Sequence, residues 1–241
     1  PVVFGIVYLG LTAAVVIAGV NKGIERFSKV LMPILFFLII GISIFCLTLD
    51  YTDASGTTRT GLEGLKIYVI PDFSDITFNK IVTVFIDALG QLFYSISVAM
   101  GIMVAYGSYV KKDVNLMNSI NQIEIFDTLV AFFAGLMIIP AVFVFMGRNG
   151  MSAGAGLMFI SLPKVFYAMG PVGNVIGFAF FLMVTFAALT SSVSIMEAIV
   201  SSMMDKFHLS RRKSAVIVTI YALIMGIIVC MGYNKLYFEF K

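Results

Sequence analysis

The strongest constraint on the fold of this chain is a series of long apolar stretches that contain no charged residue. A helix needs about 20 mainly apolar residues to cross the hydrocarbon core of a bilayer, and each stretch approaches or exceeds that length. The fifth stretch is too long for one crossing, and Pro171 and Gly173 indicate that its start belongs to the preceding loop. The charge-free stretches are 1–20, 30–49, 88–110, 128–147, 165–196 and 214–234.

We therefore predict an all-α polytopic membrane protein, with one membrane domain over 1–241. The composition agrees, because 60% of the residues are hydrophobic and only 12% are charged, whereas about a quarter of a soluble domain is charged. Six transmembrane helices are expected, at about 1–20, 30–49, 80–110, 118–147, 174–203 and 213–234. The expected location is the plasma (inner) membrane.

Other classes of function find little support in the sequence. The net charge of +3 is too small to indicate a nucleic-acid partner. No phosphate-binding loop, zinc-ligand spacing or Ser–His–Asp set is present. The single histidine, His208, lies in a basic loop, where a solvated position is expected. We predict that the protein is not an enzyme.

The charged residues of the loops predict an orientation. Loops 21–29, 111–113 and 205–213 hold nine Lys or Arg in 21 positions, whereas loops 50–80 and 148–164 hold five in 48. Cytoplasmic loops are the basic ones, so the first three loops are expected inside and both chain ends outside. The chain begins at an apolar Pro1 without the charged start of a signal peptide. This start indicates a piece of a longer protein that has further helices upstream.

Polar residues inside the apolar stretches are candidates for function. Asp127 begins the fourth stretch, and an acid inside a membrane usually faces a partner, an ion or water. The alternative is an interfacial acid at the cytoplasmic boundary, and Glu197 at the end of the fifth stretch is open to the same two interpretations. The adjacent Thr190, Ser191 and Ser192 cover most of a helix circumference, so at least one must face another helix or a cavity.

The segment GQLFYSISVAMG (90–101) is a candidate broken helix. Its glycines and serines weaken a continuous helix, and an unwound segment exposes carbonyl groups that can hold a cation. Irregular backbone at membrane depth is tolerated only where it lines a cavity or is buried in protein. Simple helix packing at small residues remains the alternative.

The outer loop 148–174 mixes apolar residues with glycines and two prolines. That composition is unlike a freely solvated linker. We expect a short helical hairpin that folds back as a lid.

Three segments together resemble the neurotransmitter:sodium symporter family, and the resemblance runs from the family's fourth helix to its ninth. They are GIERFSKVLMP (23–33), FIDALGQLFYSISVAMGIMVAYGSYVKKD (85–113) and FAALTSSVSIMEAIVSSMMDKFHLSRRK (186–213). As is known for this family, the resemblance implies part of a ten-helix inverted-repeat core with discontinuous helices and a binding site at the membrane midplane.

The resemblance also implies roles for individual residues. Ser95 and Asp127 match ligands of a first sodium ion, with Asp127 in place of the family's usual Asn. Ala187, through its carbonyl, Thr190 and Ser191 match ligands of a second sodium ion. Tyr109 and Asp205 match a cytoplasmic gate. The positions implied for the substrate pocket are Tyr94, Ser95, Ser97, Met100, Ser191 and Ile195.

Two departures from the family's pattern refine the expectation. Ala131 stands where chloride-dependent members have a Ser, while Gln91 and Ser95 of that site remain, so Asp127 could supply the charge of chloride and chloride would not be required. Met100 replaces a residue that is often Phe. Because Met is flexible, we predict a bulky apolar or aromatic amino acid as substrate, with a small aliphatic one as the alternative.

The function implied is sodium-coupled import of an amino acid by alternating access, without an enzymatic cofactor. The expected partners are the amino acid, sodium, the lipid bilayer and the missing helices of the same protein. One alternative is proton coupling through Asp127, although the Thr190–Ser191 hydroxyl pair suits sodium better. The other is a channel or a non-transporting sensor, but polar residues concentrate in two spans rather than forming a stripe across several.

Overall fold

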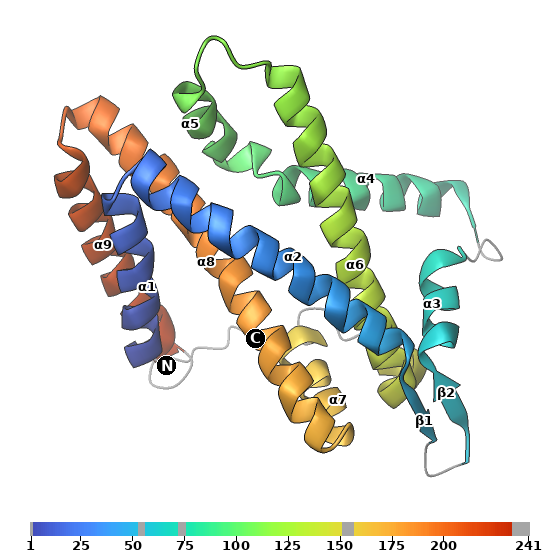
Figure 1. Cartoon of the computed structure of the whole chain (residues 1–241). Helices are drawn as coiled ribbons and strands as arrows, with labels where there is room; N and C mark the ends of the chain where they lie inside the picture. Colours follow the sequence, from blue (N-terminus) through green and yellow to red (C-terminus); the bar gives the residue numbers. More distant parts are fainter. Residues whose placement is uncertain (1, 53–55, 72–75, 151–156, 233–241) are drawn as a thin grey trace. The chain divides into compact units, whose positions relative to one another are not determined.

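The computed structural model describes residues 2–52, 56–71, 76–150 and 157–232, and this part of the chain is mainly helical (Figure 1). The elements before the helix break are α1 (Val2–Ile17), the π-helix η1 (Val20–Glu25), α2 (Arg26–Leu47), β1 (Asp50–Thr52), β2 (Thr58–Thr60), α3 (Gly61–Val69) and α4 (Phe78–Ser95). The elements after it are the 3₁₀-helix η2 (Val98–Met100), α5 (Ile102–Tyr109), α6 (Leu116–Gly150), the π-helix η3 (Leu157–Ser161), α7 (Leu162–Ala168), α8 (Pro171–Phe207) and α9 (Arg211–Gly232).

The predicted spans correspond to long continuous helices, to one shorter apolar helix and to one helix that is divided in two. Among the described residues, four helices are long and apolar enough to cross a membrane: Lys22–Leu47, Leu116–Arg148, Pro171–Phe207 and Arg211–Met231. The first predicted span is the shorter apolar helix α1, and the third is divided into α4 and α5. Helix α8 begins at Pro171, because a proline has no N–H to lose in the first turn of a helix.

The chain forms two compact units. The first contains Pro1–Met32, Ser97–Val114 and Phe186–Lys241, and the second contains Pro33–Ile96 and Asn115–Thr185. The core of the first unit joins residues three or four apart on α1, α8 and α9, so each of these helices contributes one face, and η1 adds Ile24. Its buried members are Ala13, Val16, Ile24, Val193, Met196, Val200, Ala215 and Val218.

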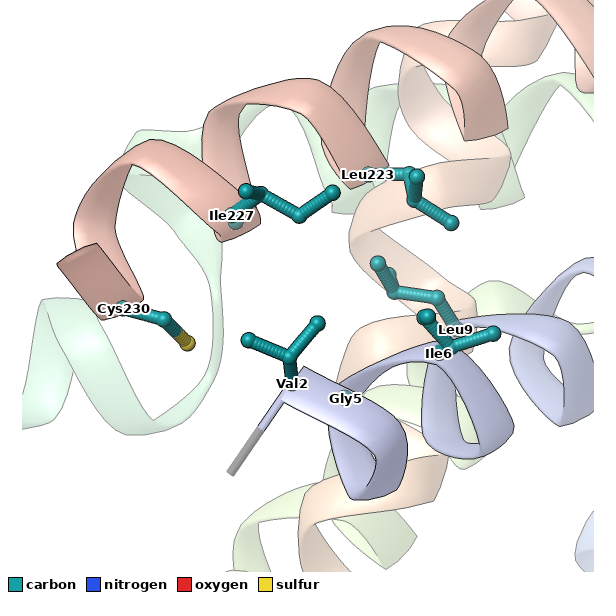
Figure 2. A pocket seen from close by; sticks show the side chains of 8 residues that line it. Val2, Gly5, Ile6, Leu9, Leu223, Ile227 and Cys230 are labelled. Carbon is teal, nitrogen blue, oxygen red and sulfur yellow. The ribbon is translucent and has the colours of Figure 1, made fainter.

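An apolar cavity of about 70 Å³ lies between α1 and α9, which run side by side in the first unit (Figure 2). Gly5 and Gly226 contribute no side chain to it, and a Cβ on either would meet no described atom within 4 Å. The lining is Val2, Gly5, Ile6, Leu9, Leu223, Gly226, Ile227 and Cys230. Without a polar side chain in that lining, the cavity is a packing gap rather than a site for a polar solute.

The second unit contains a hairpin and a short helix that our sequence interpretation did not include. Strands β1 and β2 pair antiparallel, with Tyr51 opposite Arg59. Helix α3 begins directly after β2 with a capping box, in which the Thr60 hydroxyl accepts from the N–H of Glu63 and the Glu63 carboxylate accepts from the N–H of Thr60. These reciprocal bonds satisfy free N–H groups at the helix start.

Close backbone approach fixes α3 against α6. A Cβ built on Gly64 would lie 2.6 Å from the Cα of Pro140, and one on Gly135 would lie 2.4 Å from the Tyr68 ring. The Tyr68 hydroxyl donates to the carbonyl of Phe132 at 3.4 Å. The two glycines therefore determine how closely α3 packs on α6.

Replacing Gly64 with Ala is expected to lower the stability of the second unit. Overpacking costs about 1–3 kcal/mol, which exceeds the roughly 0.5–1 kcal/mol that Ala gains over Gly inside a helix. Thermal unfolding in detergent measures the difference. Gly41→Ala on α2 is the matched control, because its Cβ meets no described atom within 4 Å. A Gly64 variant as stable as that control would contradict the prediction.

The described part of the predicted lid, 148–174, is helical. Helix α6 is kinked at Gly147, whose φ of 65° lies in the left-handed region. Residues 151–156 lie outside the described part. Beyond them, α7 buries Phe166, whose ring lies 3.1 Å from a Cβ built on Gly177 of α8. Helix α7 therefore packs against α8, while the hairpin that folds back as a lid stays a prediction.

Candidate functional site

The expected helix break is present between α4 and α5. Helix α4 ends at Ser95, and Ser97 takes a left-handed conformation with φ 56° and ψ 27°. Gly101, with φ 72°, separates η2 from α5. A left-handed serine is uncommon and costs about 1–3 kcal/mol, so surrounding structure must impose it. The break leaves carbonyl groups at the end of α4 and N–H groups at the start of α5 without helical partners.

Asp127 lies against the end of α4. The Ser95 hydroxyl donates to Oδ2 of Asp127 at 3.0 Å, and Asp127 is half-buried on α6. Na⁺ has nearly the ionic radius of Ca²⁺, whose oxygen ligands lie at about 2.3–2.6 Å, so two ligands at right angles stand roughly 3.2–3.7 Å apart. A small movement of Ser95 would therefore let both oxygens bind one cation.

The hydroxyl cluster of α8 forms a second group of oxygens. The Thr190 hydroxyl donates to the carbonyl of Ala187 at 2.9 Å and to that of Phe186 at 3.2 Å. Thr190 is buried, whereas Ser191 is exposed. The helical period of about 100° per residue places Ala187, Thr190 and Ser191 on one face of α8. Hydroxyl and carbonyl oxygens are ligands that suit a hard cation.

The positions expected for a substrate pocket are all accessible. Tyr94 and Ser95 close α4 in the second unit, whereas Ser97, Met100, Ser191 and Ile195 belong to the first. Ser97 is half-buried and the other five are exposed. Ser191 and Ile195 are four residues apart and share a face of α8. None of the six belongs to the hydrophobic core of its own unit.

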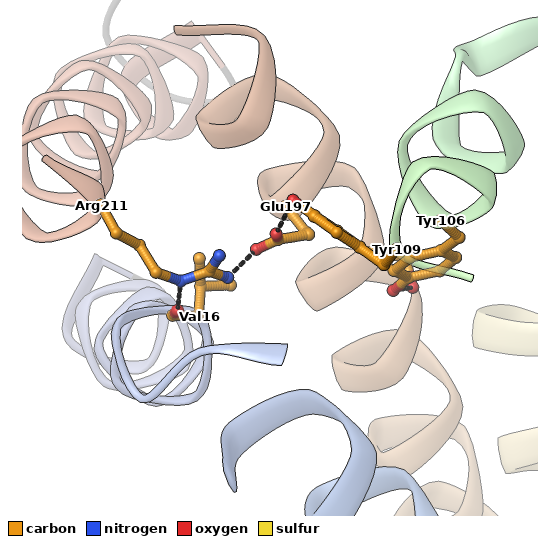
Figure 3. A network of polar contacts seen from close by, with 6 residues as sticks. Val16, Tyr106, Tyr109, Glu197 and Arg211 are labelled. Carbon is orange, nitrogen blue, oxygen red and sulfur yellow. Dashed lines mark hydrogen bonds and ion pairs between the residues drawn. The ribbon is translucent and has the colours of Figure 1, made fainter. Parts of the chain in front are cut away.

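A buried ion pair stands near the cytoplasmic end expected for α8 (Figure 3). Glu197 is completely buried and forms an ion pair with the guanidinium of Arg211 on α9. Its other carboxylate oxygen accepts from the Tyr109 hydroxyl at 2.7 Å. Nε of Arg211 donates to the carbonyl of Val16 at 2.9 Å, near the end of α1. The carboxylate thus joins α8 to α5 and α9, and Arg211 extends the network to α1.

Comparison with known proteins decides the family. The chain matches the model described as the sodium:neurotransmitter symporter family over residues 5–239. This chain belongs to that family. Members are sodium-dependent transporters rather than enzymes, and the chain is part of a multi-pass membrane protein.

Individual relatives agree with the family match. An uncharacterized sodium-dependent transporter of Bacillus subtilis is 36% identical over 231 residues, which are 96% of this chain and 48% of the relative. One from Methanocaldococcus jannaschii is 32% identical over 95% of this chain and 46% of the relative. The chain thus spans about half the length of the curated relatives it matches.

A solved structure supports the fold. The crystal structure of MhsT in complex with L-phenylalanine matches with a TM-score of 0.80 and 35% identity. The match covers 100% of this chain and 51% of MhsT. A likeness at this level shows the symporter fold, an all-α polytopic membrane architecture.

The expected gate residues of the symporter differ in their surroundings. The Tyr109 hydroxyl is held by Glu197, while Asp205 is exposed near the end of α8 and its side chain has no hydrogen bond or ion pair to another described residue. Sequence reasoning left Glu197 open between a boundary acid and an intramembrane one. The structure places it in the core of the first unit, so the network of Glu197, Arg211 and Tyr109 is what the sequence interpretation missed.

Proposed function

We propose that this chain carries the ion-binding and substrate-binding helices of a symporter that imports a bulky apolar or aromatic amino acid with sodium. The observation that carries the proposal is the contact between Ser95 and Asp127 at the helix break, 3.0 Å apart. Sodium dependence of the family supports the ion, and the amino acid in the MhsT complex supports the substrate class. The proposal includes two sodium sites, one at Ser95 and Asp127 and one at Ala187, Thr190 and Ser191.

The first sodium site would use the break in the helix. A cation held by both Ser95 and Asp127 ties the end of α4 to α6, and the Ser95 hydroxyl then directs a lone pair rather than its proton toward the ion. The left-handed Ser97 and Gly101 let α4 and α5 change angle without breaking a regular helix. Sodium drives transport only if it favours the substrate-binding state, because a ligand shifts an equilibrium by its differential affinity.

The second sodium site would use the face of α8 that carries Ala187, Thr190 and Ser191. In the structure, the Thr190 hydroxyl donates its proton to the Ala187 carbonyl. A bound cation would take the place of this hydrogen bond: the Thr190 hydroxyl would keep its proton and turn it toward the carbonyl of Phe186, 3.2 Å away. Its lone pair, the Ala187 carbonyl and the Ser191 hydroxyl would then face the ion. The site is completed by residues outside this chain, in keeping with a chain that spans about half of its relatives.

The substrate class rests on the pocket positions. Tyr94 and Met100 are exposed at the break, and Ile195 is exposed on α8. A flexible thioether in place of a rigid ring leaves room for a large side chain. Competition of labelled leucine by tyrosine and by alanine separates a bulky substrate from a small one.

Coupling to protons is the second candidate, since a carboxylate in hydrogen-bond contact with a hydroxyl is also a proton acceptor. The family's sodium dependence favours the cation over the proton.

The test of the proposed function is uptake of labelled amino acids into proteoliposomes that hold the intact protein. An inward sodium gradient is expected to drive accumulation, and replacing sodium with potassium at equal membrane potential should abolish it. Thr190→Val removes an ion-ligating oxygen and keeps the shape, so it should reduce sodium-driven accumulation by about 10- to 100-fold.

The matched control is Thr185→Val on the same helix. The Thr185 hydroxyl also bonds back to a carbonyl one turn earlier, that of Phe181 at 2.8 Å, but it lies roughly 140° around the helix from Thr190. Accumulation that follows a proton gradient and ignores sodium would contradict the proposal. Equal losses in both threonine variants would show that the second sodium site is not at Thr190.

A further inference from the structure

Helix α8 is held from two sides by tyrosine hydroxyls. The Tyr106 hydroxyl of α5 donates to Oγ of Ser194 at 2.7 Å, and Ser194 donates to the carbonyl of Thr190 at 3.1 Å. On another side, the hydroxyls of Tyr8 on α1 and Ser192 lie 2.5 Å apart. All of these residues belong to the first unit.

The two contacts lie on nearly opposite faces of α8. At about 100° per residue, the residues Ala187, Thr190, Ser191 and Ser194 share one face, and Ser192 lies roughly 150° away from its centre. Tyr106 therefore reaches the face expected to bind sodium, while Tyr8 reaches the back of the same turn. Contacts on opposite sides resist rotation of the helix about its axis.

Packing holds Tyr8 in place for this contact. Val16 lies two turns after Tyr8 on the same face of α1, and it is completely buried in the core that also holds Met196 and Val200 of α8. On α8, Ser192, Met196 and Val200 follow one another at intervals of four residues. The hydroxyl pair thus lies one turn from the packed core on α8 and two turns from it on α1.

A small rotation of α8 would disturb an ion site. The Cα atoms of a helix lie about 2.3 Å from its axis, so a rotation of about 10° moves them by roughly 0.4 Å, and side-chain oxygens farther out move more. Ligand distances in metal sites are held to about 0.2 Å. A rotation of this turn would therefore change the affinity of a cation site at Thr190 and Ser191.

From this geometry we propose that Tyr8 is a positioning residue for the second sodium site and acts through Ser192 on the back of α8. The inference rests on the proposed function, since it concerns the same site. Tyr8 touches neither ion nor substrate. Its hydroxyl sets the angle at which α8 presents the carbonyl of Ala187 and the hydroxyls of Thr190 and Ser191.

The test is a sodium titration of thermal stability, with sodium alone as the ligand and choline chloride keeping the ionic strength constant. A ligand that binds the folded state raises the unfolding temperature, so the concentration dependence reports affinity without a substrate. Tyr8→Phe is expected to raise the half-saturating sodium concentration by about three- to tenfold, at the lower edge of what partners of metal ligands contribute. Ser192→Ala should give the same shift, and the double variant no more than either.

Two further variants separate positioning from general support of the fold. Tyr221→Phe, at an exposed tyrosine of α9, should leave the titration unchanged. In a Thr190→Val background, Tyr8→Phe should have no further effect, because the site that it positions is already lost. A purely structural Tyr8 would lower the unfolding temperature without sodium and leave the half-saturating concentration unmoved.

The outcomes are distinguishable from failure of the proposed function. If sodium does not stabilise the unmodified protein, the sodium sites themselves are wrong. If sodium stabilises it and Tyr8→Phe titrates identically, or if the effects of Tyr8→Phe and Ser192→Ala add, the positioning role is overturned.

Discussion

Replacing Arg211 with Gln is expected to lower the free energy of unfolding by about 3–5 kcal/mol, because it leaves a buried charge without its partner. Glu197 has no exposed surface, and the Arg211 side chain is only 21% exposed. The Tyr109 hydroxyl alone cannot balance the carboxylate. Arg211 also holds the carbonyl of Val16, so the variant loosens the end of α1 as well. Thermal unfolding in detergent measures the loss.

The matched control is Arg212→Gln, one residue along the same helix, where the side chain is exposed. Its effect should stay within about 0.5 kcal/mol, as for most surface substitutions. Adding Glu197→Gln to Arg211→Gln should recover much of the loss, since the uncompensated charge is then gone. If the Arg211 and Arg212 variants unfold at the same temperature, the ion pair contributes nothing to stability.

Features that depend on local composition could be predicted from the sequence. The glycines and serines of 90–101 indicated a broken helix, and the structure has one between Ser95 and Ile102. An acid at the start of an apolar stretch indicated a partner, and Asp127 contacts Ser95. Poor helix formers weaken a helix, and a charge in lipid is costly. Both kinds of residue can be recognised from the sequence alone.

The buried network could not be predicted in the same way. Glu197 and Arg211 both lie where apolar stretches end, and such positions usually mark the membrane boundary. Their pairing depends on the turn between α8 and α9, which brings Arg211 back toward Glu197, and on the packing of α1 beside α9. Composition and periodicity predict neither the direction of that turn nor the packing of α1 beside α9.

The hairpin and α3 are a different case, because a local signal was available. Thr60 and Glu63 have the spacing of a capping box, which predicts a helix start directly after Thr60. The prediction for loop 50–80 rested on its charges alone and contained no helix. The contacts of Gly64 with Pro140 and of Gly135 with Tyr68 depend on tertiary packing and had no such signal.

Replacing Asp127 with Asn is expected to reduce sodium-driven uptake in chloride-free medium by about 10- to 100-fold, because a charged hydrogen-bond partner contributes roughly 1.5–3 kcal/mol. The unmodified protein should transport equally well in chloride and in gluconate, since Asp127 already supplies a negative charge beside Ser95. Ala131 lies one turn after Asp127 on α6, on the same face. Asp127→Asn combined with Ala131→Ser should therefore regain uptake when chloride is added.

Sodium-driven uptake into proteoliposomes, in chloride and in gluconate, compares the unmodified protein, Asp127→Asn and the double variant. Glu124→Gln is the matched control, because Glu124 is an exposed acid on the same helix, and its uptake should not depend on chloride. A steep chloride requirement in the unmodified protein would contradict the role proposed for Asp127. So would full activity of Asp127→Asn in gluconate, because the cation would then need no charge at that position. Chloride rescue confined to the double variant would instead show that one fixed carboxylate and one bound anion meet the same electrostatic requirement.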